Sequence, residues 1–593
     1  MAGSHTYCRK AAQSSRLATI LLVAGVSGFA LASAYRSPVS FDAVAADHSA
    51  HLMEEAPSDT TAPDPKQQQQ HQDSDLPQYR LSEIRKHDAN SDTPWVIHGN
   101  KVYDITDWIP GHPGGQVILR AAGGSIEPYW DIFTIHKSDY VYEILSQYQI
   151  GYVHPADLVD GKPAQDAIED PFANDPIRDP SFTVHTAKPR NAEPPEEALD
   201  EHFMTPNHLF YIRNHMWVPK VENGGDDHVL TIELPDGSNK EYTLKELKAK
   251  FPSHTVAAAL QCSGNRRRHM SEGSGRKANG LPWTVGAISN ATWEGVYLSD
   301  ILNDAGFDVA SARNGTSEAK HIHFGGLEAY SASIPIKKAV DPQGDVLLAY
   351  SMNGEPLPRD HGFPLRAIVP GHVAARSVKW LSQITLSDEE SPSQWQRRDY
   401  KCFGPNQTQV DWDSAPAIQE LPVQSAITSI KLGKATPPPN AQQSASSPEA
   451  RTISVGGYAY SGGGRAIIRV DVSLDDGKTW DQAYLLPDCQ AADGSPSPCL
   501  GNAHWTWKRW RYEGTLPASA LQSQSSSDAD AGKRCTQVVV KATDEVYNTQ
   551  PETHAATWNV RGNLATAWHR VKVCADCKPT PTSKGVEKTA SRE

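Results

Sequence analysis

Residues 95–115 read Trp95-Val-Ile-His-Gly-Asn-Lys-Val-Tyr-Asp-Ile-Thr-Asp-Trp-Ile-Pro-Gly-His-Pro-Gly-Gly115. Apolar residues on both sides of Gly99-Asn100 predict two short strands joined by a tight turn. His112 then stands between Pro and Gly residues, where the backbone can approach a bound group closely. A second histidine, His136, follows 24 residues later, beyond segments that we expect to be helical. Two imidazoles in this setting suit a planar iron cofactor held between them.

The context of the two histidines narrows this interpretation. His112-Pro-Gly-Gly115 follows Val102-Tyr-Asp-Ile-Thr-Asp107, and Glu127-Pro-Tyr-Trp130 precedes His136. This pattern resembles the cytochrome b5 family over nearly all of residues 79–155. The resemblance implies a haem b module in which His112 and His136 are the axial ligands and Ser138 and Tyr140 line the haem edge. Such a module carries electrons one at a time and does not itself catalyse.

The charge of this region predicts the kind of redox partner that it would meet. Residues 79–155 hold six basic and nine acidic residues, and residues 156–170 hold five acidic residues and one lysine. An acidic surface steers a basic partner toward it. Over the whole chain of 593 residues the formal charge is −14. That balance argues against nucleic acid as a partner, because nucleic-acid binders usually carry a basic face.

A second chemical feature is the isolated cysteine in Leu260-Gln-Cys-Ser-Gly-Asn-Arg-Arg-Arg268. It follows the strand-like residues 255–260, and the arginines after it favour a thiolate. A thiolate is either a nucleophile or a soft metal ligand. A nucleophile would need a nearby base, for which His269 is a candidate. From these residues alone, a buried structural cysteine followed by a basic turn fits as well.

Long stretches around Cys262 resemble the sulfite oxidase family of molybdenum enzymes. The matching segments are Phe210-Tyr-Ile-Arg-Asn-His215, the Cys262 segment, Pro282-Trp-Thr-Val-Gly-Ala-Ile288, Leu357-Pro-Arg-Asp-His-Gly-Phe-Pro-Leu-Arg366, Ala374-Ala-Arg-Ser-Val-Lys-Trp380 and Trp395-Gln-Arg-Arg-Asp-Tyr400. The resemblance implies that Cys262 is a thiolate ligand of molybdenum, beside the dithiolene of one pterin cofactor, molybdopterin.

The resemblance also implies roles for other residues. The cofactor-binding set is Tyr211, Ile212, Arg213, Asn214, His215, His361, Arg366, Ser377, Val378 and Lys379. Arg213, Arg267 and Arg561 would hold the anionic substrate, because the planar guanidinium suits oxyanions. Tyr400 would lie near the molybdenum oxo group, and Trp283 would form a pocket wall. The loop before Ala329 is several residues shorter than in the family, and we expect Glu328 to replace the usual aspartate at the cofactor.

The C-terminal third of the chain predicts a β-sandwich. Residues 468–474 alternate apolar and polar residues, Asp475-Asp-Gly477 predicts a turn, and residues 478–484 complete a hairpin. Residues 505–512 and 537–542 predict further strands. Short strands with polar loops are typical of an immunoglobulin-like sandwich. Gly456–Arg465 and Trp558–Gly562 resemble the dimerisation domain of the same family, which implies a homodimer.

These segments predict an α+β multidomain chain. We expect a presequence at 1–46, a linker at 47–78, the cytochrome b5-like haem domain at 79–155, a flexible hinge at 156–170, a mixed α/β molybdopterin domain at 171–418, the sandwich at 419–573 and a tail at 574–593. Polar stretches at 435–450 and 515–534 predict long surface loops. Cys574 and Cys577 form a CxxC in the expected tail, but a zinc site would need two more ligands.

The N-terminus allows two interpretations. Residues 1–41 lack acidic residues and contain an apolar run at 17–34. This pattern fits either a secretory signal or a mitochondrial presequence with an apolar sorting segment. A haem domain that is joined by a flexible hinge to the molybdopterin domain, and that passes electrons to cytochrome c, favours the mitochondrial interpretation. We then expect the mature protein in the intermembrane space, without a stable membrane anchor.

The family resemblance implies the oxidation of sulfite to sulfate at molybdenum, followed by single-electron transfers through haem b to cytochrome c. Two alternatives stay open at this stage. Nitrate reductases share both modules, but they place the haem domain after the molybdenum domain and add a flavin reductase. A non-catalytic haem scaffold has only the shortened loop before Ala329 in its favour.

Overall fold

The computed structural model describes residues 76–112, 115–137, 139–163, 170–407, 410–436, 450–488, 499–516, 522–523 and 534–574, which belong to one compact unit, Gln72–Glu593. The expected presequence, Ser138, the side chain of Tyr140 and Cys577 lie outside the described residues. None of the described helices is long and apolar enough to cross a membrane.

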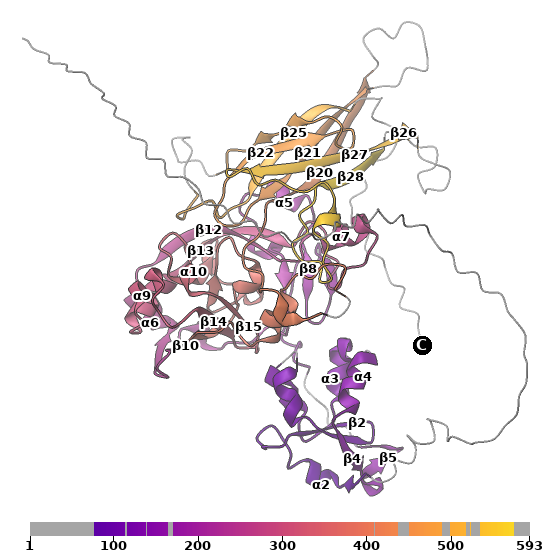
Figure 1. Cartoon of the computed structure of the whole chain (residues 1–593), viewed down its shortest axis with the longest axis vertical. Coiled ribbons are helices and arrows are strands. Elements are labelled where there is room, and N and C mark those ends of the chain that lie inside the picture. The colour runs from indigo at the N-terminus through magenta and orange to yellow at the C-terminus, as the bar shows by residue number, and fades with distance from the viewer. Residues whose placement is uncertain are drawn as a thin grey trace, which may run out of the picture. The chain divides into compact units, whose positions relative to one another are not determined.

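The expected haem domain combines a small sheet with short helices (Figure 1). Its strands are β1 (Gln78–Tyr79), β2 (Trp95–His98), β3 (Lys101–Asp104) and β4 (Gln149–Val153), in the order β1-β4-β3-β2. Its α-helices are α2 (Leu81–Ile84), α3 (Glu127–Ile132) and α4 (Asp139–Ser146). The predicted turn is confirmed, because β2 pairs antiparallel with β3 and Gly99 has a φ of 63°. The expected helix after Gly115 is the 3₁₀ segment η3 (Gly115–Ala121).

The hinge begins with structure of its own. Strands β5 (Leu158–Val159) and β6 (Lys162–Pro163) form an antiparallel pair inside the segment expected to be a flexible linker. Residues 164–169 lie outside the described part of the chain. The described chain resumes at Asp170 and continues into the central domain.

The central domain contains two five-stranded sheets and a smaller one. The first has the order β11-β10-β19-β14-β15, the second β12-β13-β16-β17 with β18 on β16, and the third β7-β8-β9. The strands are β7 (Thr183–Thr186), β8 (Asn191–Glu193), β9 (Ile212–Arg213), β10 (Val229–Glu233), β11 (Asn239–Thr243), β12 (His254–Gln261), β13 (Ile288–Tyr297), β14 (His321–Gly326), β15 (Ser331–Pro335), β16 (Leu347–Met352), β17 (Glu355–Pro356), β18 (Arg366–Ile368) and β19 (Leu381–Ser387).

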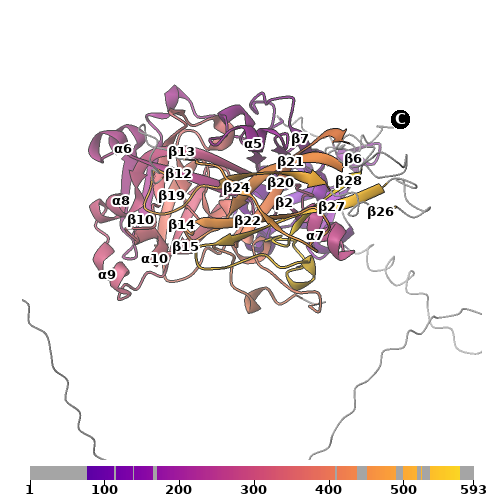
Figure 2. The ribbon, with the colours of Figure 1, turned by 90° about the horizontal axis from the view of Figure 1, so that it is seen from above.

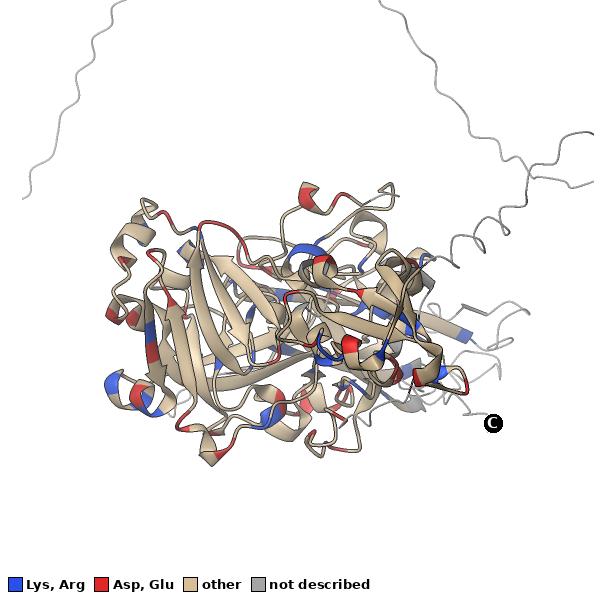
Figure 3. Cartoon of the chain, turned by 90° about the horizontal axis from the view of Figure 1, so that it is seen from below, with Lys and Arg blue, Asp and Glu red and all other residues tan. Residues whose placement is uncertain are grey.

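Short helices cover these sheets. They are α5 (Ala198–Glu201), α6 (Leu244–Lys250), α7 (Arg267–Ser274), α8 (Leu298–Asp304), α9 (Val309–Asn314) and α10 (Ile336–Val340). α6 begins with a capping box, in which the Thr243 hydroxyl accepts from the Glu246 N–H and the Glu246 carboxylate accepts from the Thr243 N–H. In Figure 3, basic and acidic residues are interspersed over helices and loops.

The C-terminal domain is a sandwich of two sheets. One has the order β20-β21-β25-β24, and the other β23-β22-β27-β26 with β28 on β27 (Figures 1 and 2). The strands are β20 (Gln424–Thr436), β21 (Ala450–Tyr460), β22 (Ile467–Ser473), β23 (Asp481–Gln482), β24 (Tyr484–Leu485), β25 (Lys508–Leu516), β26 (Gln522–Ser523), β27 (Arg534–Asp544) and β28 (His569–Cys574). Side chains from both sheets, such as Val455 and Val540, share one buried core, which confirms the predicted sandwich.

Some boundaries in this domain differ from the sequence prediction. The strand expected at 505–512 begins only at Lys508, because Trp505 and Trp507 pack into cores shared with the central domain. The expected second hairpin strand is split into β23 and β24, which belong to different sheets. β26 lies inside the loop expected at 515–534. These differences arise from tertiary packing, which local patterns do not encode.

Cys574 corrects a further expectation, since it does not belong to a tail. It ends β28 and forms a disulfide with Cys535 of the neighbouring strand β27. Cys499 is disulfide-bonded as well. Among the described cysteines, Cys262 and Cys402 are free.

We expect Cys574→Ser to lower the unfolding free energy of the C-terminal domain by about 3–4 kcal/mol. The disulfide closes a loop between residues 39 apart in sequence, and losing it increases the entropy of the unfolded chain. Denaturant unfolding measures the change, with Cys402→Ser as the control. Equal stability of Cys574→Ser and wild type would contradict the prediction.

Candidate active site and haem site

Cys262 stands where β12 ends and the chain turns into α7. Its N–H donates to the Ala287 carbonyl at 2.9 Å, and its sulfur accepts from the Gly264 N–H at 3.4 Å. A Cβ at position 264 would lie 2.4 Å from the guanidinium of Arg267, so any larger residue here would displace that side chain. The turn therefore holds the thiol at the end of a buried strand, with an arginine packed beneath it.

Cys262 faces a pocket that encloses about 730 Å³, counting the part open to solvent. Ten residues predicted for the site line it: Tyr211, Arg213, His215, Cys262, His361, Arg366, Ser377, Val378, Lys379 and Tyr400. They come from segments far apart in the sequence, so the structure brings most of the predicted set together around one cavity.

The pocket wall carries an excess of positive charge. Arg213, Arg366 and Lys379 line it, and none of its lining residues is acidic. Burial lowers the pKa of Lys379 well below its ordinary value and that of Arg366 to about 10. The Nε of Arg366 is buried without a hydrogen-bond partner among the described residues. Buried cations need compensation, so this wall fits an anionic ligand such as a phosphate-bearing cofactor.

His215 and Tyr400 form a hydrogen-bonded pair at the pocket, with Nε2 and Oη 3.1 Å apart. Burial, with Arg213 and Lys379 nearby, lowers the pKa of His215 well below its ordinary value. Burial raises the pKa of Tyr400. At neutral pH the pair is therefore a neutral imidazole and a protonated phenol. When the imidazole carries its proton on Nε2 and donates to the phenol, the phenol can donate its own proton to an oxygen in the pocket.

Six predicted residues do not line this pocket: Ile212, Asn214, Arg267, Trp283, Glu328 and Arg561. Arg267 donates from Nε to the Arg561 carbonyl at 2.9 Å and from Nη1 to the Leu281 carbonyl at 2.9 Å. The Arg561 side chain pairs with Asp399, next to Tyr400. Arg267 therefore joins the pocket turn to the C-terminal domain.

Glu328 is not among the residues that line the pocket, and its side chain lies beside Trp217. Its carboxylate accepts a hydrogen bond from the Trp217 side chain and lies near Arg120 of the haem domain. The side chain is buried, and burial raises its pKa to about 7, against the lowering effects of Trp217 and Arg120. The contact of Glu328 with the cofactor therefore stays a prediction.

We expect Glu328→Gln to change the pH dependence of stability. A raised pKa means that the folded state favours the protonated carboxyl, so its stabilising contribution is complete below the ordinary pKa of 4.5. That contribution is lost as the pH rises toward 7. The amide does not ionise, so the difference in unfolding free energy between variant and wild type should shift in favour of the variant between pH 4.5 and pH 7. A constant difference would contradict the assignment.

The two predicted haem ligands face one another. The rings of His112 and His136 have centroids 6.2 Å apart and planes 14° apart. Metal–imidazole bonds of about 2 Å on each side, plus the distance from each nitrogen to its ring centre, account for this separation. The Nδ1 of His136 is hydrogen-bonded to the Phe133 carbonyl at 2.9 Å, which leaves Nε2 as the nitrogen that can bind a metal. This geometry fits a metal held between two imidazoles.

Three family models match the chain in succession. Residues 80–154 match the cytochrome b5-like haem/steroid binding domain. Residues 215–395 match the oxidoreductase molybdopterin binding domain, and residues 415–576 match the Mo-co oxidoreductase dimerisation domain.

Whole-length relatives match as well. The chain is 46% identical to sulfite oxidase of Gallus gallus, over 83% of this chain and 99% of that protein. It is 43% identical to mitochondrial sulfite oxidase of Homo sapiens, over 84% of each. The chain belongs to the sulfite oxidase family. A nitrate reductase of Hordeum vulgare is 35% identical, but the aligned region spans 68% of this chain and 43% of that protein.

Membership of the sulfite oxidase family gives molybdopterin and haem as the cofactors. The described residues fit both groups. The paired imidazoles favour haem over a steroid in the N-terminal domain. The cationic pocket with one free thiol fits a phosphorylated pterin that binds a soft metal.

Sequence reasoning missed several pocket residues, including Met216, Tyr330 and Trp380. Tyr330 follows Ala329, whose φ of 62° is rare for a residue with a side chain. Trp380 has a φ of 53° and packs against Lys379, whose Nζ lies 4.4 Å from the ring centroid. Trp380 lies in a segment quoted for the family resemblance and Tyr330 lies just after the shortened loop, but their pattern alone did not distinguish them from core aromatics.

Proposed function

We propose that this chain oxidises sulfite to sulfate at a molybdopterin centre in the Cys262 pocket. One observation supports this proposal most strongly. The free thiol of Cys262, the basic side chains of the wall and the His215–Tyr400 pair all line one cavity. A thiolate suits the metal, and the cations suit both the cofactor's phosphate and an oxyanion substrate.

The chain's own residues would prepare the reaction. When bound, molybdenum supplies the oxygen atom for transfer and accepts two electrons. Arg213 would hold the sulfite oxygens, and Tyr400, protonated by burial, would donate to an oxygen of the anion. Arg366, Lys379 and His361 would bind the cofactor, with Tyr211, His215, Ser377 and Val378 around it. Arg267 and Arg561 would fix the pocket's border with the C-terminal domain.

Electrons would leave one at a time through the haem domain. Phe133, which bonds to His136 through its carbonyl, lies 5.5 Å from Phe172 and 6.4 Å from Trp217 between ring centroids. Arg120 stacks 4.3 Å over the Trp217 ring. Trp217 follows Met216, a pocket residue, so these contacts support a short path from the pocket to the haem.

The cellular setting follows from the same proposal. Cytochrome c is the proposed final acceptor, because the haem domain and hinge are acidic and would attract a basic partner. The mitochondrial relatives support a mitochondrial location, and we propose the intermembrane space for a mature form without a membrane anchor. The match to a dimerisation domain supports a homodimer. We propose domain borders at 79–155, 171–418 and, with Cys574 added, 419–574.

We expect Arg213→Gln to raise the KM for sulfite roughly ten- to a hundredfold, the cost of losing a hydrogen bond to a charged group. Within the described residues, the hydrogen bonds of Arg213 use Nη1, to Asn191 Oδ1 at 3.2 Å and the Asn214 carbonyl at 2.6 Å. Steady-state kinetics on sulfite would measure the change. The exposed Arg398→Gln is the control. An unchanged KM in Arg213→Gln would refute the anion-binding role.

A further inference from the structure

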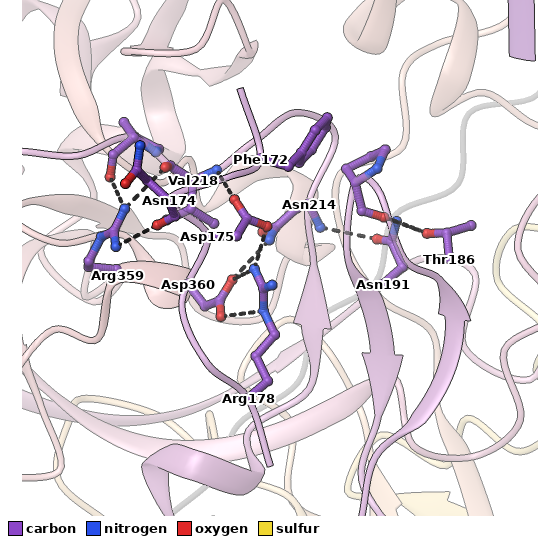
Figure 4. Close-up of polar contacts among 12 residues, drawn as sticks. Phe172, Asn174, Asp175, Arg178, Thr186, Asn191, Asn214, Val218, Arg359 and Asp360 are labelled. Carbon is purple, nitrogen blue, oxygen red and sulfur yellow. Dashed lines mark hydrogen bonds and ion pairs between the residues drawn. The ribbon is translucent and has the colours of Figure 1, made fainter. Parts of the chain in front are cut away.

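A buried arginine fixes the segment that follows the hinge. Arg178 donates from Nε and Nη2 to the two carboxylate oxygens of Asp360, at 2.8 Å each. Its Nη2 also donates to Asp175 at 2.8 Å. Figure 4 shows the guanidinium facing both oxygens of Asp360. The three side chains are at most 10% exposed, so this is a buried, bidentate ion pair.

Asp360 continues this network to the pocket wall. Its Oδ1 accepts from Asn214 Nδ2 at 3.0 Å, and its carbonyl accepts from Lys379 Nζ at 2.8 Å. Lys379 also donates to the Arg213 carbonyl at 3.1 Å and to Asn214 Oδ1. Lys379 and Arg213 line the pocket, whereas Asn214 does not. Asn214 therefore connects the Arg178–Asp360 ion pair to Lys379 in the pocket wall.

The charges make this arrangement sensitive to Arg178. Burial would raise the pKa of Asp360, but the bonds and charge of Arg178 hold it below its ordinary value. Without Arg178, Lys379 is one of the cations that would still act on the carboxylate. Lys379 would then be drawn from its bonds at the wall. Removing one partner of a buried ion pair is strongly unfavourable for the charge left behind.

We propose that Arg178 is a positioning residue for the molybdopterin pocket, which acts by holding Asp360 and, through it, Asn214 and Lys379. The inference rests on the proposed assignment of this pocket. Arg178 lies shortly after the hinge, so the same ion pair anchors the end of the hinge to the pocket wall.

The test uses the full-length protein loaded with both cofactors. Arg178→Gln should release the pterin about 10- to 100-fold faster than wild type, the range found when partners of metal-site ligands are lost. It should also contain less molybdenum per haem. Metal analysis, haem absorbance and pterin fluorescence after dilution measure these quantities without turnover.

Two further variants separate positioning from general loss of structure. Arg359 ties down the same segment, through Nη1 to the Asn174 carbonyl at 2.9 Å and Nη2 to the Val218 carbonyl at 3.3 Å, but its side chain does not bond to Asp360 (Figure 4). Arg359→Gln should therefore retain molybdopterin. The double variant Arg178→Gln with Asp360→Asn removes the charge at Asp360, so that Asp175 is the carboxylate of this cluster left without its ion-pair partner. It should therefore retain the cofactor better than Arg178→Gln alone, in which both carboxylates lose that partner.

The outcomes decide between the inference and its premise. Faster release in Arg178→Gln, with retention in Arg359→Gln and recovery in the double variant, would support the positioning role. Wild-type retention in Arg178→Gln, equal loss in Arg359→Gln, or no recovery in the double variant would overturn it while the pocket assignment stands. Wild-type protein that binds haem but no pterin would overturn the assignment and the inference together.

Discussion

Cys262→Ser is expected to abolish sulfite turnover, with a loss of more than about a hundredfold, while the haem spectrum stays intact. The estimate is a lower bound, because losing even an outer partner of a metal ligand costs 10- to 100-fold. A serine hydroxyl is not a soft anionic ligand, so it would not replace the thiolate at molybdenum. The side chain is 7% exposed at the end of β12, and serine fits the space without disturbing the sheet.

Cys402→Ser is the matched control for this variant. Cys402 is the other free cysteine among the described residues, and burial raises its pKa to about 11, which keeps its thiol protonated. Its replacement should leave sulfite turnover unchanged. Turnover at the wild-type rate in Cys262→Ser would contradict the proposed role of Cys262 as a molybdenum ligand.

His136→Ala should abolish haem binding and, with it, the reduction of cytochrome c by sulfite. His136 and His112 hold opposite faces of the proposed haem site, with planes 14° apart, and one imidazole cannot supply both axial ligands. The pocket around Cys262 does not include His136, so a small one-electron acceptor such as ferricyanide should still be reduced. The measurement is haem absorbance together with turnover with each acceptor.

His154→Ala serves as the control within the haem domain. Its side chain caps the 3₁₀ turn η5 (Pro155–Asp157) by accepting from the Ala156 N–H at 3.1 Å. We expect this variant to keep both haem and cytochrome c reduction. Retained haem in His136→Ala, or loss of ferricyanide reduction in that variant, would contradict the proposed division of labour between the two sites.

Local patterns were sufficient for the elements that local chemistry determines. The hairpin at Gly99-Asn100 and the ring pair of His112 and His136 follow from residues close in sequence. The strand before Cys262 was likewise visible as an apolar run, and the structure extends it to His254–Gln261.

Other features depend on contacts between distant segments. The Cys574–Cys535 disulfide was not predicted, because its cysteines lie 39 residues apart and the CxxC of Cys574 and Cys577 was weighed only as part of a zinc site. Glu328 was predicted to contact the cofactor from its place after a shortened loop, and its packing beside Trp217 joins segments that lie far apart in the sequence. The Arg178–Asp360 ion pair joins residues 182 apart, which no local pattern reveals.

Sulfite-driven reduction of the haem in purified protein, followed by absorbance, tests most directly whether the Cys262 pocket oxidises sulfite. We expect micromolar sulfite to reduce the haem and nitrate not to reoxidise it. Such a result requires the pocket, the substrate and the path to the haem to work together. Haem that stays oxidised with sulfite, in protein that contains molybdenum, would contradict sulfite as the substrate.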